Sequence, residues 1–313
     1  MEIKTDAIVL RAADYKDADK ILTLLTPSAG KLTAGIKGVK KSGARLAFAA
    51  QPFSFCEYVL AEKNGRNTVT SAYQHDGFFP LRTDITRYYA ACAVAEIADE
   101  LSAEGSENEA LFIAAAQALR SLAYGEENET PAEALCSFLL TALFEAGYMI
   151  DLDGCGACGN EIEKRAGAES GAVSLAGAES GAVSLAGAEK SACYFDFAGG
   201  RFLCGNCGAA AGGAGGNLVR ASIKTYDFLR KISGISCENT QKNVDSGAKN
   251  AENTLKNGDF FDKNGAKTSK NDAELRALRL LKAYLSGKTE RDYPCFTEFY
   301  RLYRDDFKGD FRE

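Results

Sequence analysis

Residues 5–32 are TDAIVLRAADYKDADKILTLLTPSAGKL, and this stretch decides the fold of the amino-terminal part of the chain. Ala7–Ala12 and Ile21–Leu25 are rich in branched apolar residues, a composition that favours β-strands. Pro27-Ser28-Ala29-Gly30 has the composition of a turn. The stretch therefore predicts short strands joined by tight turns.

The strand pattern continues to about residue 78. Lys31–Val39, Phe53–Leu60 and Asn67–Tyr73 have strand composition, and Asn64-Gly65 is a type I′ hairpin signal between the last two runs. Five short strands in about 75 residues suit a small barrel better than a sandwich. We therefore expect a β-barrel domain over residues 1–80.

Beyond Arg82 the apolar residues recur at the three-to-five-residue steps of helices, and Leu111–Tyr124 and Pro131–Tyr148 continue this period. Pro131 stands where the first turn of a helix tolerates proline. We expect a helical domain in two parts, residues 81–150 and 218–313.

Two low-complexity segments interrupt the chain. Residues 166–175 are AGAESGAVSL, residues 176–185 repeat them without change, and residues 186–189 begin a third copy. Within about 236–272, Lys-Asn pairs recur every seven residues, but no two apolar positions recur per heptad, which argues against a coiled coil. We expect this second segment to be disordered.

The charge of the chain is unevenly distributed. The 313 residues contain 37 Lys and Arg against 43 Asp and Glu, a net charge of −6, with 46% hydrophobic and 26% charged residues. These values exclude a wholly disordered chain and a bulk polycation. Residues 1–80 nevertheless hold eleven Lys and Arg against eight acids, a net of +3. A nucleic-acid partner of the barrel is therefore not excluded.

The sequence shows no targeting signal. Its first residues lack the basic and apolar regions of a secretory signal. The most apolar stretch, Leu135–Ile150, is interrupted by Glu145 and is too short to span a bilayer. We expect a cytoplasmic protein with no membrane partner, in which the ten cysteines stay reduced.

Four of the cysteines form two Cys-x-x-Cys pairs, Cys155-Gly-Ala-Cys158 and Cys204-Gly-Asn-Cys207. Two such turns complete a tetrahedral shell of four sulfurs, which suits Zn²⁺. The gap of 45 residues between the pairs is long, but removing two repeat copies leaves 45 − 20 = 25. Residues 151–217 are therefore expected to form a zinc lobe. A redox dithiol and metal-free thiols are the alternatives, and the redox case is weakened because no βαβ pattern surrounds the pairs.

A basic loop follows the third predicted strand, and further cations lie near it in sequence. Lys and Arg on a small barrel can neutralise phosphates, although a solvated loop explains the charge equally well. Tyr15, Phe48 and Phe53 are possible stacking partners for bases, but core packing is favoured for them. The candidate DNA-binding residues are Arg11, Lys16, Lys20, Lys31, Lys37, Lys40, Lys41 and Arg45.

No enzyme constellation stands out. His75 is the only histidine, and no serine or cysteine partner is placed beside it by the sequence, so triad catalysis is poorly supported. Four thiolate ligands would leave no open position on a zinc ion, which makes that zinc structural and not catalytic.

The carboxy-terminal segment Tyr293–Phe311 is rich in aromatic residues at helical spacing, with two arginines between them. We expect a last helix that packs on the helical domain. The alternative is an apolar surface with a cationic rim that takes an acidic, aromatic tail of a partner. The residues concerned are Phe296, Phe299, Tyr300, Arg301, Tyr303, Arg304 and Phe307.

Four passages in order resemble the bacterial RecO family of recombination mediators. They are residues 5–32, the basic GIKGVKKSGARLAFAAQPF of residues 35–53, LFEAGYMIDLDGCGACG of residues 143–159, and GGRFLCGNC of residues 199–207. The resemblance covers most of the chain apart from 166–189 and about 236–272. It implies an α+β multidomain protein with an N-terminal OB-fold barrel, an α-helical domain and a zinc-ribbon-like insert that uses the four paired cysteines.

The resemblance also implies a function. Members of the family bind single- and double-stranded DNA, anneal complementary strands, and with RecR help to load RecA onto DNA coated by single-strand-binding protein, whose acidic C-terminal tail they recognise. We therefore expect a non-enzymatic, nucleoid-associated DNA-repair mediator with one structural zinc ion. The rival hypothesis is a protein-only interaction scaffold with a structural zinc site.

Overall fold

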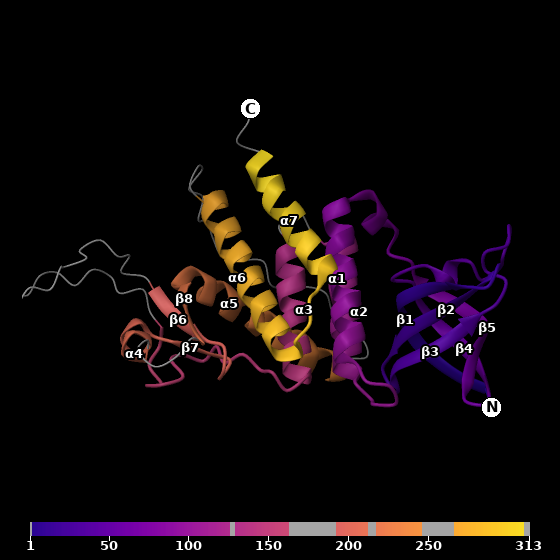
Figure 1. Ribbon diagram of the computed structural model, residues 1–313, viewed down its shortest axis with the longest axis horizontal. Helices are drawn as coiled ribbons and strands as arrows, with labels where there is room; N and C mark the ends of the chain where they lie inside the picture. Colours follow the sequence, from indigo (N-terminus) through magenta and orange to yellow (C-terminus); the bar gives the residue numbers. More distant parts are fainter. Residues whose placement is uncertain (1, 126–128, 163–191, 212–216, 246–265, 310–313) are drawn as a thin grey trace, which may run out of the picture. The chain divides into compact units, whose positions relative to one another are not determined.

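The computed structural model describes residues 2–125, 129–162, 192–211, 217–245 and 266–309 (Figure 1). The ten-residue repeats at 166–189 and the middle of the Lys-Asn segment, residues 246–265, lie outside the described residues. The chain forms two compact units. The first comprises Met1–Met149 and Lys231–Glu313, and the second comprises Ile150–Arg230.

Residues 2–76 form a closed five-stranded barrel with the strand order β1-β2-β3-β5-β4. Neighbouring strands are antiparallel except β3 and β5, which pair in parallel at Ala34 with Asn67 and at Gly35 with Thr68. This arrangement confirms the predicted OB-type barrel. The strands are β1 (Glu2–Tyr15), β2 (Asp19–Thr26), β3 (Gly30–Ile36), β4 (Phe55–Lys63) and β5 (Arg66–Asp76).

Local sequence explains the hairpin between β4 and β5. Asn64 and Gly65 both have positive φ, 53° and 71°, as a type I′ turn requires, so the predicted turn is confirmed. Inside the barrel, Leu22, Leu24 and Tyr58 are fully buried. The hydroxyl of Tyr58 donates to the carbonyl of Ala49 at 2.7 Å and so holds the short 3-10 helix η1 (Phe48–Ala50) at the barrel.

The turn between β2 and β3 joins the barrel to the helices. Gly30 has φ +58°, and a Cβ atom there would lie 2.3 Å from the carbonyl oxygen of Ser106 and 2.4 Å from that of Ala103. The backbone N–H of Lys31 donates to Ala103 at 3.1 Å, and its ammonium lies 3.1 Å from the carboxylate of Asp99. Both parts of the first unit are thus fixed to each other at this glycine.

A Gly30→Ala variant is expected to lose about 2 kcal/mol or more of unfolding free energy. Left-handed backbone costs an alanine roughly 1–2 kcal/mol, and the clash with two backbone oxygens adds to this cost. Gly43→Ala is the matched control, because Gly43 has φ +71° with no atom within 4 Å of the added Cβ. Urea titration compares the two variants, and equal losses would contradict the role given to close approach.

The first three helices of the first unit begin at side-chain caps. The carboxylate of Asp84 accepts from the backbone N–H of Arg87 at 3.0 Å at the start of α1. Thr130 and Glu133, on either side of Pro131, form a capping box, which confirms the prediction that this proline opens a helix. The first three helices are α1 (Ile85–Leu101), α2 (Glu109–Tyr124) and α3 (Pro131–Glu145), and a 3-10 turn η2 (Phe79–Thr83) precedes them.

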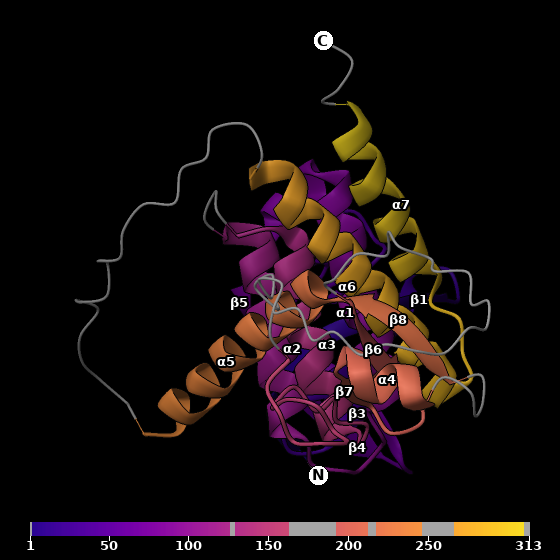
Figure 2. The ribbon, with the colours of Figure 1, turned by 90° about the vertical axis from the view of Figure 1, so that its left-hand side faces the viewer.

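The last two helices, α6 (Ala266–Thr289) and α7 (Pro294–Gly309), lie side by side, as Figures 1 and 2 show from two directions. α7 packs on α1 and buries Phe296, Phe299 and Tyr303. The predicted packing role of the aromatic tail is therefore confirmed for these three residues. The side chain of Phe307 lies outside the described residues.

The second unit contains a three-stranded sheet in the order β7-β6-β8, with α4 against it (Figure 2). Phe195, Phe202 and Tyr226 are fully buried in this unit. The ring centroid of Phe202 lies 4.9 Å from that of Phe195 and 5.2 Å from that of Tyr226. The elements are β6 (Ala192–Asp196), β7 (Arg201–Leu203), α4 (Gly205–Ala211), β8 (Leu218–Ser222) and the first part of α5 (Ile223–Asp245).

Two predicted boundaries differ from the structure. The zinc lobe was expected to end at residue 217, but β8 pairs with β6, so the compact unit continues to Arg230. The backbone is helical at both ends of the segment predicted to be disordered, because α5 runs on to Asp245 and α6 begins at Ala266. Once a helix is nucleated, each further residue adds a hydrogen bond, so a polar sequence can continue it.

Candidate metal centre and nucleic-acid interface

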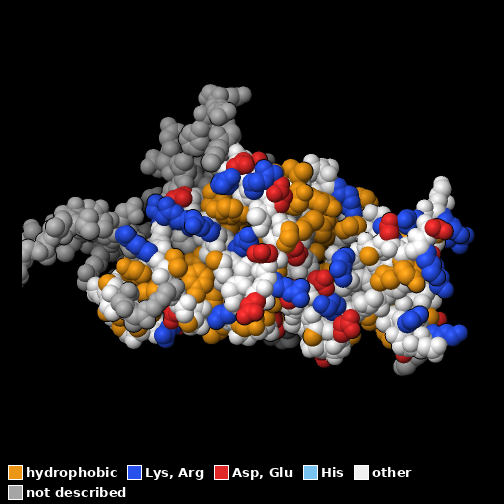
Figure 3. Space-filling model, viewed as in Figure 1, with side chains coloured by type: hydrophobic (Ala, Val, Ile, Leu, Met, Phe, Trp, Pro, Cys, Tyr) orange, Lys and Arg blue, Asp and Glu red, His pale blue; other side chains and the backbone are white. Residues whose placement is uncertain are grey.

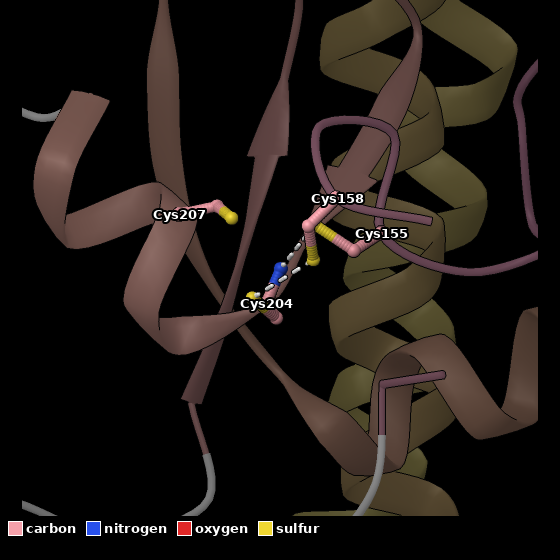
Figure 4. A group of neighbouring side chains, drawn as sticks. All are labelled: Cys155, Cys158, Cys204 and Cys207. Carbon is pink, nitrogen blue, oxygen red and sulfur yellow. Dashed lines mark hydrogen bonds between the residues drawn. The ribbon is translucent and has the colours of Figure 1, made fainter. Parts of the chain in front are cut away.

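Four sulfur atoms converge in the second unit. Cys155 and Cys158 lie on the loop before Ile162, Cys204 immediately precedes α4, and Cys207 lies in its first turn (Figure 4). The four Sγ atoms lie within 4.8 Å of one another, and those of Cys158 and Cys204 are 3.9 Å apart. The structure thus brings together all four predicted metal ligands.

Backbone donors surround the sulfur of Cys155. The N–H of Cys204 donates to it at 3.3 Å, which links one cysteine pair to the other. Burial raises the pKa of Cys155, but hydrogen bonds from the backbone N–H groups of Cys204, Cys158 and Ala157 outweigh burial and bring the pKa to about 6. The thiol of Cys155 therefore loses its proton more readily than an ordinary thiol and can bind a metal as a thiolate.

The pKa of Cys207 is shifted in the opposite direction. Hydrogen bonds to the sulfurs of Cys204, Cys158 and Cys155 raise the pKa of Cys207 to about 12. Four sulfurs so close together cannot all lose their protons without a cation between them. A bound metal reverses this effect, since a coordinating thiol is deprotonated outright.

The glycines that follow the two pairs serve the site in different ways. Gly159 has φ +72°, so the first turn needs its left-handed backbone. Gly208 lies in α4, where a Cβ atom would come within 2.1 Å of the ring of Tyr194. The second glycine is therefore required for close packing and not for its backbone angles.

The residues fit a zinc ion. Zn–S bonds of about 2.3 Å in a tetrahedron place neighbouring sulfurs about 3.8 Å apart. The measured separation of 3.9 Å between Cys158 and Cys204 agrees with this edge, and the upper limit of 4.8 Å needs only a small inward movement. The four cysteines can hold a metal ion, and their sulfurs would fill all four positions of a tetrahedral coordination shell.

Sequence patterns did not reveal the role of Arg201. The side chain of Arg201 packs against Gly156 of the first cysteine pair, where an added Cβ atom would lie 2.6 Å from the Cδ of Arg201. Its guanidinium donates to the carbonyl of Gly156 at 3.3 Å and to the carboxylate of Asp196 at 3.2 Å. The β6–β7 hairpin thereby supports the first cysteine pair.

The predicted DNA-binding residues lie on the barrel, and three of them are engaged within the chain. The ammonium of Lys31 is bound to Asp99 of α1, as described above. Lys40 donates to the carboxylate of Asp14 at 2.8 Å, and Lys20 lies 4.0 Å from the same carboxylate. The hydrogen bond from Lys40 lowers the pKa of Asp14.

The other five cations are exposed, and none of them forms an ion pair with a residue that the structure describes. They are Arg11, Lys16, Lys37, Lys41 and Arg45. Figure 3 shows Lys and Arg side chains along the barrel end of the first unit. These five residues, which we call the free cations, are the part of the predicted set that is available to phosphates.

The connection between β3 and η1 is held against the tip of the β1–β2 hairpin. The backbone N–H of Lys40 donates to the carbonyl of Ala18 at 3.1 Å, and that of Gly38 donates to the carboxylate of Asp19 at 2.8 Å. The structure therefore brings Lys37 and Lys41 close to Lys16 and leaves Lys31 at the far end of β3.

The three aromatic residues considered as stacking partners for bases also differ in how far they are exposed. Phe53 is 2% exposed, and Phe48 packs against the barrel core, so core packing is confirmed for both. Tyr15, at the tip of the hairpin, is 47% exposed and does not follow that expectation.

Comparisons with known proteins agree with the fold and the site. The sequence model of the family described as Recombination protein O N terminal matches residues 1–78, and that of Recombination protein O C terminal matches residues 82–203. The chain belongs to the RecO family.

Similar proteins carry the name DNA repair protein RecO. That of Desulforamulus reducens is 35% identical over 161 residues, which is 51% of this chain and 61% of the relative. That of Shouchella clausii is 34% identical over 158 residues, covering 50% and 60%. The chain thus spans about three fifths of the length of the curated relatives it matches.

The RecO N-terminal match includes the whole barrel and all eight predicted DNA-binding residues. The RecO C-terminal match includes Cys155 and Cys158 and ends at residue 203, immediately before Cys204. No helix among the residues the structure describes is both long and apolar enough to cross a membrane.

Proposed function

We propose that this RecO-family chain is a DNA-repair mediator that binds single- and double-stranded DNA and anneals complementary strands. The observation that carries the proposal is the set of free cations on an OB-type barrel in a chain of this family. Relatives that bear the name DNA repair protein RecO support it.

The mechanism is electrostatic. Two approaching strands repel each other through their phosphates, and Lys and Arg side chains lower this repulsion by replacing condensed counterions. Lys37, Lys41 and Arg45 lie on one short connection and can hold phosphates of one backbone. Arg11 and Lys16 on β1 and its turn extend the basic surface, so two backbones come close enough for their bases to pair.

The chain acts in this proposal by binding and not by catalysis. Zinc in the cysteine cluster would be structural, because the four thiolates fill its tetrahedral shell. Its contribution is to hold the two cysteine-bearing turns together in the second unit.

Protein partners complete the proposed function. The family resemblance supports action together with RecR in loading RecA, and recognition of the acidic C-terminal tail of single-strand-binding protein. Within α7, Arg301 pairs with Glu298, and Arg304 lies 3.1 Å from Asp305. Because both arginines are paired with acids of the same helix, they are less available to an acidic tail.

The proposal is tested by the salt dependence of single-stranded DNA affinity. With all five free cations on phosphates, the logarithm of affinity is expected to fall against the logarithm of salt with a slope of about −3.5. Fluorescence anisotropy of a labelled oligonucleotide measures this slope, and a strand-annealing assay follows pairing. An affinity that is absent or independent of salt would favour the rival, a protein-only interaction scaffold.

A further inference from the structure

Tyr15 lies in an unusual position for an aromatic side chain. It is the last residue of β1, directly opposite Asp19, and 47% of its surface is exposed. The ammonium of Lys16 lies 5.2 Å from the centroid of its ring. Lys16 itself has φ +56°, so the chain turns sharply immediately after the tyrosine.

The tip that carries Tyr15 is firmly held. Asp14 before it accepts from the Lys40 ammonium, and Ala18 and Asp19 after it accept from the backbone of the basic connection at 3.1 and 2.8 Å. A side chain on such a support loses little further freedom when it binds a ligand, which favours affinity.

Two of the free cations share the outward face of Tyr15, in addition to Lys16 beside its ring. Ala12 packs against the barrel core, so the alternation of β1 directs Arg11 and Tyr15 outward. Lys37 follows Ile36, which is fully buried in the core, and is itself exposed. From strand geometry, Arg11 lies about 13 Å from Tyr15 along β1, and Lys37 about 10 Å away across two strands.

We propose that Tyr15 stacks on an unpaired base of single-stranded DNA, while Arg11, Lys16 and Lys37 neutralise the phosphates on either side. The inference rests on the proposed function and adds a cause of strand preference. In a duplex each base lies between its neighbours, so its face is closed to a protein ring. A single strand exposes that face, and an aromatic side chain beside cations is the surface that takes it.

Tyr15→Ala is therefore expected to weaken binding of a single-stranded oligonucleotide about five- to a hundredfold and to change duplex binding by less than about twofold. Tyr15→Phe should bind as the unaltered protein does, because the ring remains. The salt slope should stay the same in both variants, since no charge is removed.

A fluorescent reporter makes the test direct. The chain contains no tryptophan, so Tyr15→Trp introduces a single one at the proposed contact. Tyr73→Trp is the matched control. Tyr73 is 69% exposed on the outside of β5. It faces Glu57 on the neighbouring strand, and its ring lies against that of His75, which is hydrogen-bonded to Asp6. Tyr73 is thus an exposed tyrosine with acids near it. A single-stranded oligothymidine should quench the tryptophan at 15 and leave that at 73 unchanged.

The outcomes separate the two proposals. Equal single-stranded affinities of the unaltered protein and Tyr15→Ala, or equal quenching at positions 15 and 73, would overturn the stacking role while DNA binding stands. No DNA affinity in the unaltered protein would overturn the proposed function and the stacking role together. A loss confined to single strands with quenching confined to position 15 supports both.

Discussion

A Cys155→Ser variant is expected to purify with well under one equivalent of zinc and with the second unit largely unfolded. A structural zinc site of this kind contributes on the order of 10–16 kcal/mol of binding free energy, which in a small unit is also folding free energy. Cys155 is the most informative of the four ligands, because it is buried and its sulfur accepts the backbone bond that joins the two pairs.

Zinc content by atomic absorption and hydrogen exchange of β6 and β8 measure the two effects. Cys295→Ser is the control, since Cys295 is half-buried in the first unit and far from the cluster in sequence. A chelator should reproduce the unfolding in the unaltered protein, with the barrel still protected. A full equivalent of zinc in Cys155→Ser would refute the assignment of the ligands.

Replacing Lys37 and Lys41 together with glutamate should lower single-stranded DNA affinity at low salt roughly tenfold or more. Two phosphate contacts are lost, so the slope of log affinity against log salt should become shallower by about 1.4. The two changes are not expected to unfold the barrel, because both side chains are exposed and neither forms an ion pair within the described part of the chain.

Lys63→Glu with Arg66→Glu is the matched control, with the same change of charge on the same barrel. Both residues are exposed, face each other beside the β4–β5 turn, and form no ion pair within the described part of the chain. Anisotropy titrations at several salt concentrations compare the pairs. If the control pair weakened DNA binding as much as the Lys37 and Lys41 pair, the overall charge of the barrel, and not this site, would govern affinity.

The features predictable from sequence are those set by short-range chemistry. Asn64-Gly65 dictates its turn because two adjacent residues must adopt positive φ, and each Cys-x-x-Cys pair carries its own turn. Lys31 could not be separated from the other cations, because its partner Asp99 is 68 residues away. The pairing of β8 with β6 is hidden for a related reason, since β7 and α4 lie between the two strands in the sequence.

Tyr15 illustrates a different limit. Strand alternation places its side chain on the outward face, but much of that face is covered by helices, as the burial of Thr23 and Leu25 on β2 shows. Whether an outward residue is covered depends on how far the hairpin extends beyond the helices, which is a property of the assembled unit. Phe53 has no clearer sequence signal than Tyr15, but the assembled unit covers it, so it is buried.

The junction at Gly30 has a mechanical consequence. It anchors one end of β2 to the segment after α1, while the proposed DNA contacts lie at the other end of the same strand, about 23 Å away. The helices also cover Thr23 and Leu25 along this strand. β2 is therefore a rigid strut that holds the proposed contacts at a fixed distance from the junction.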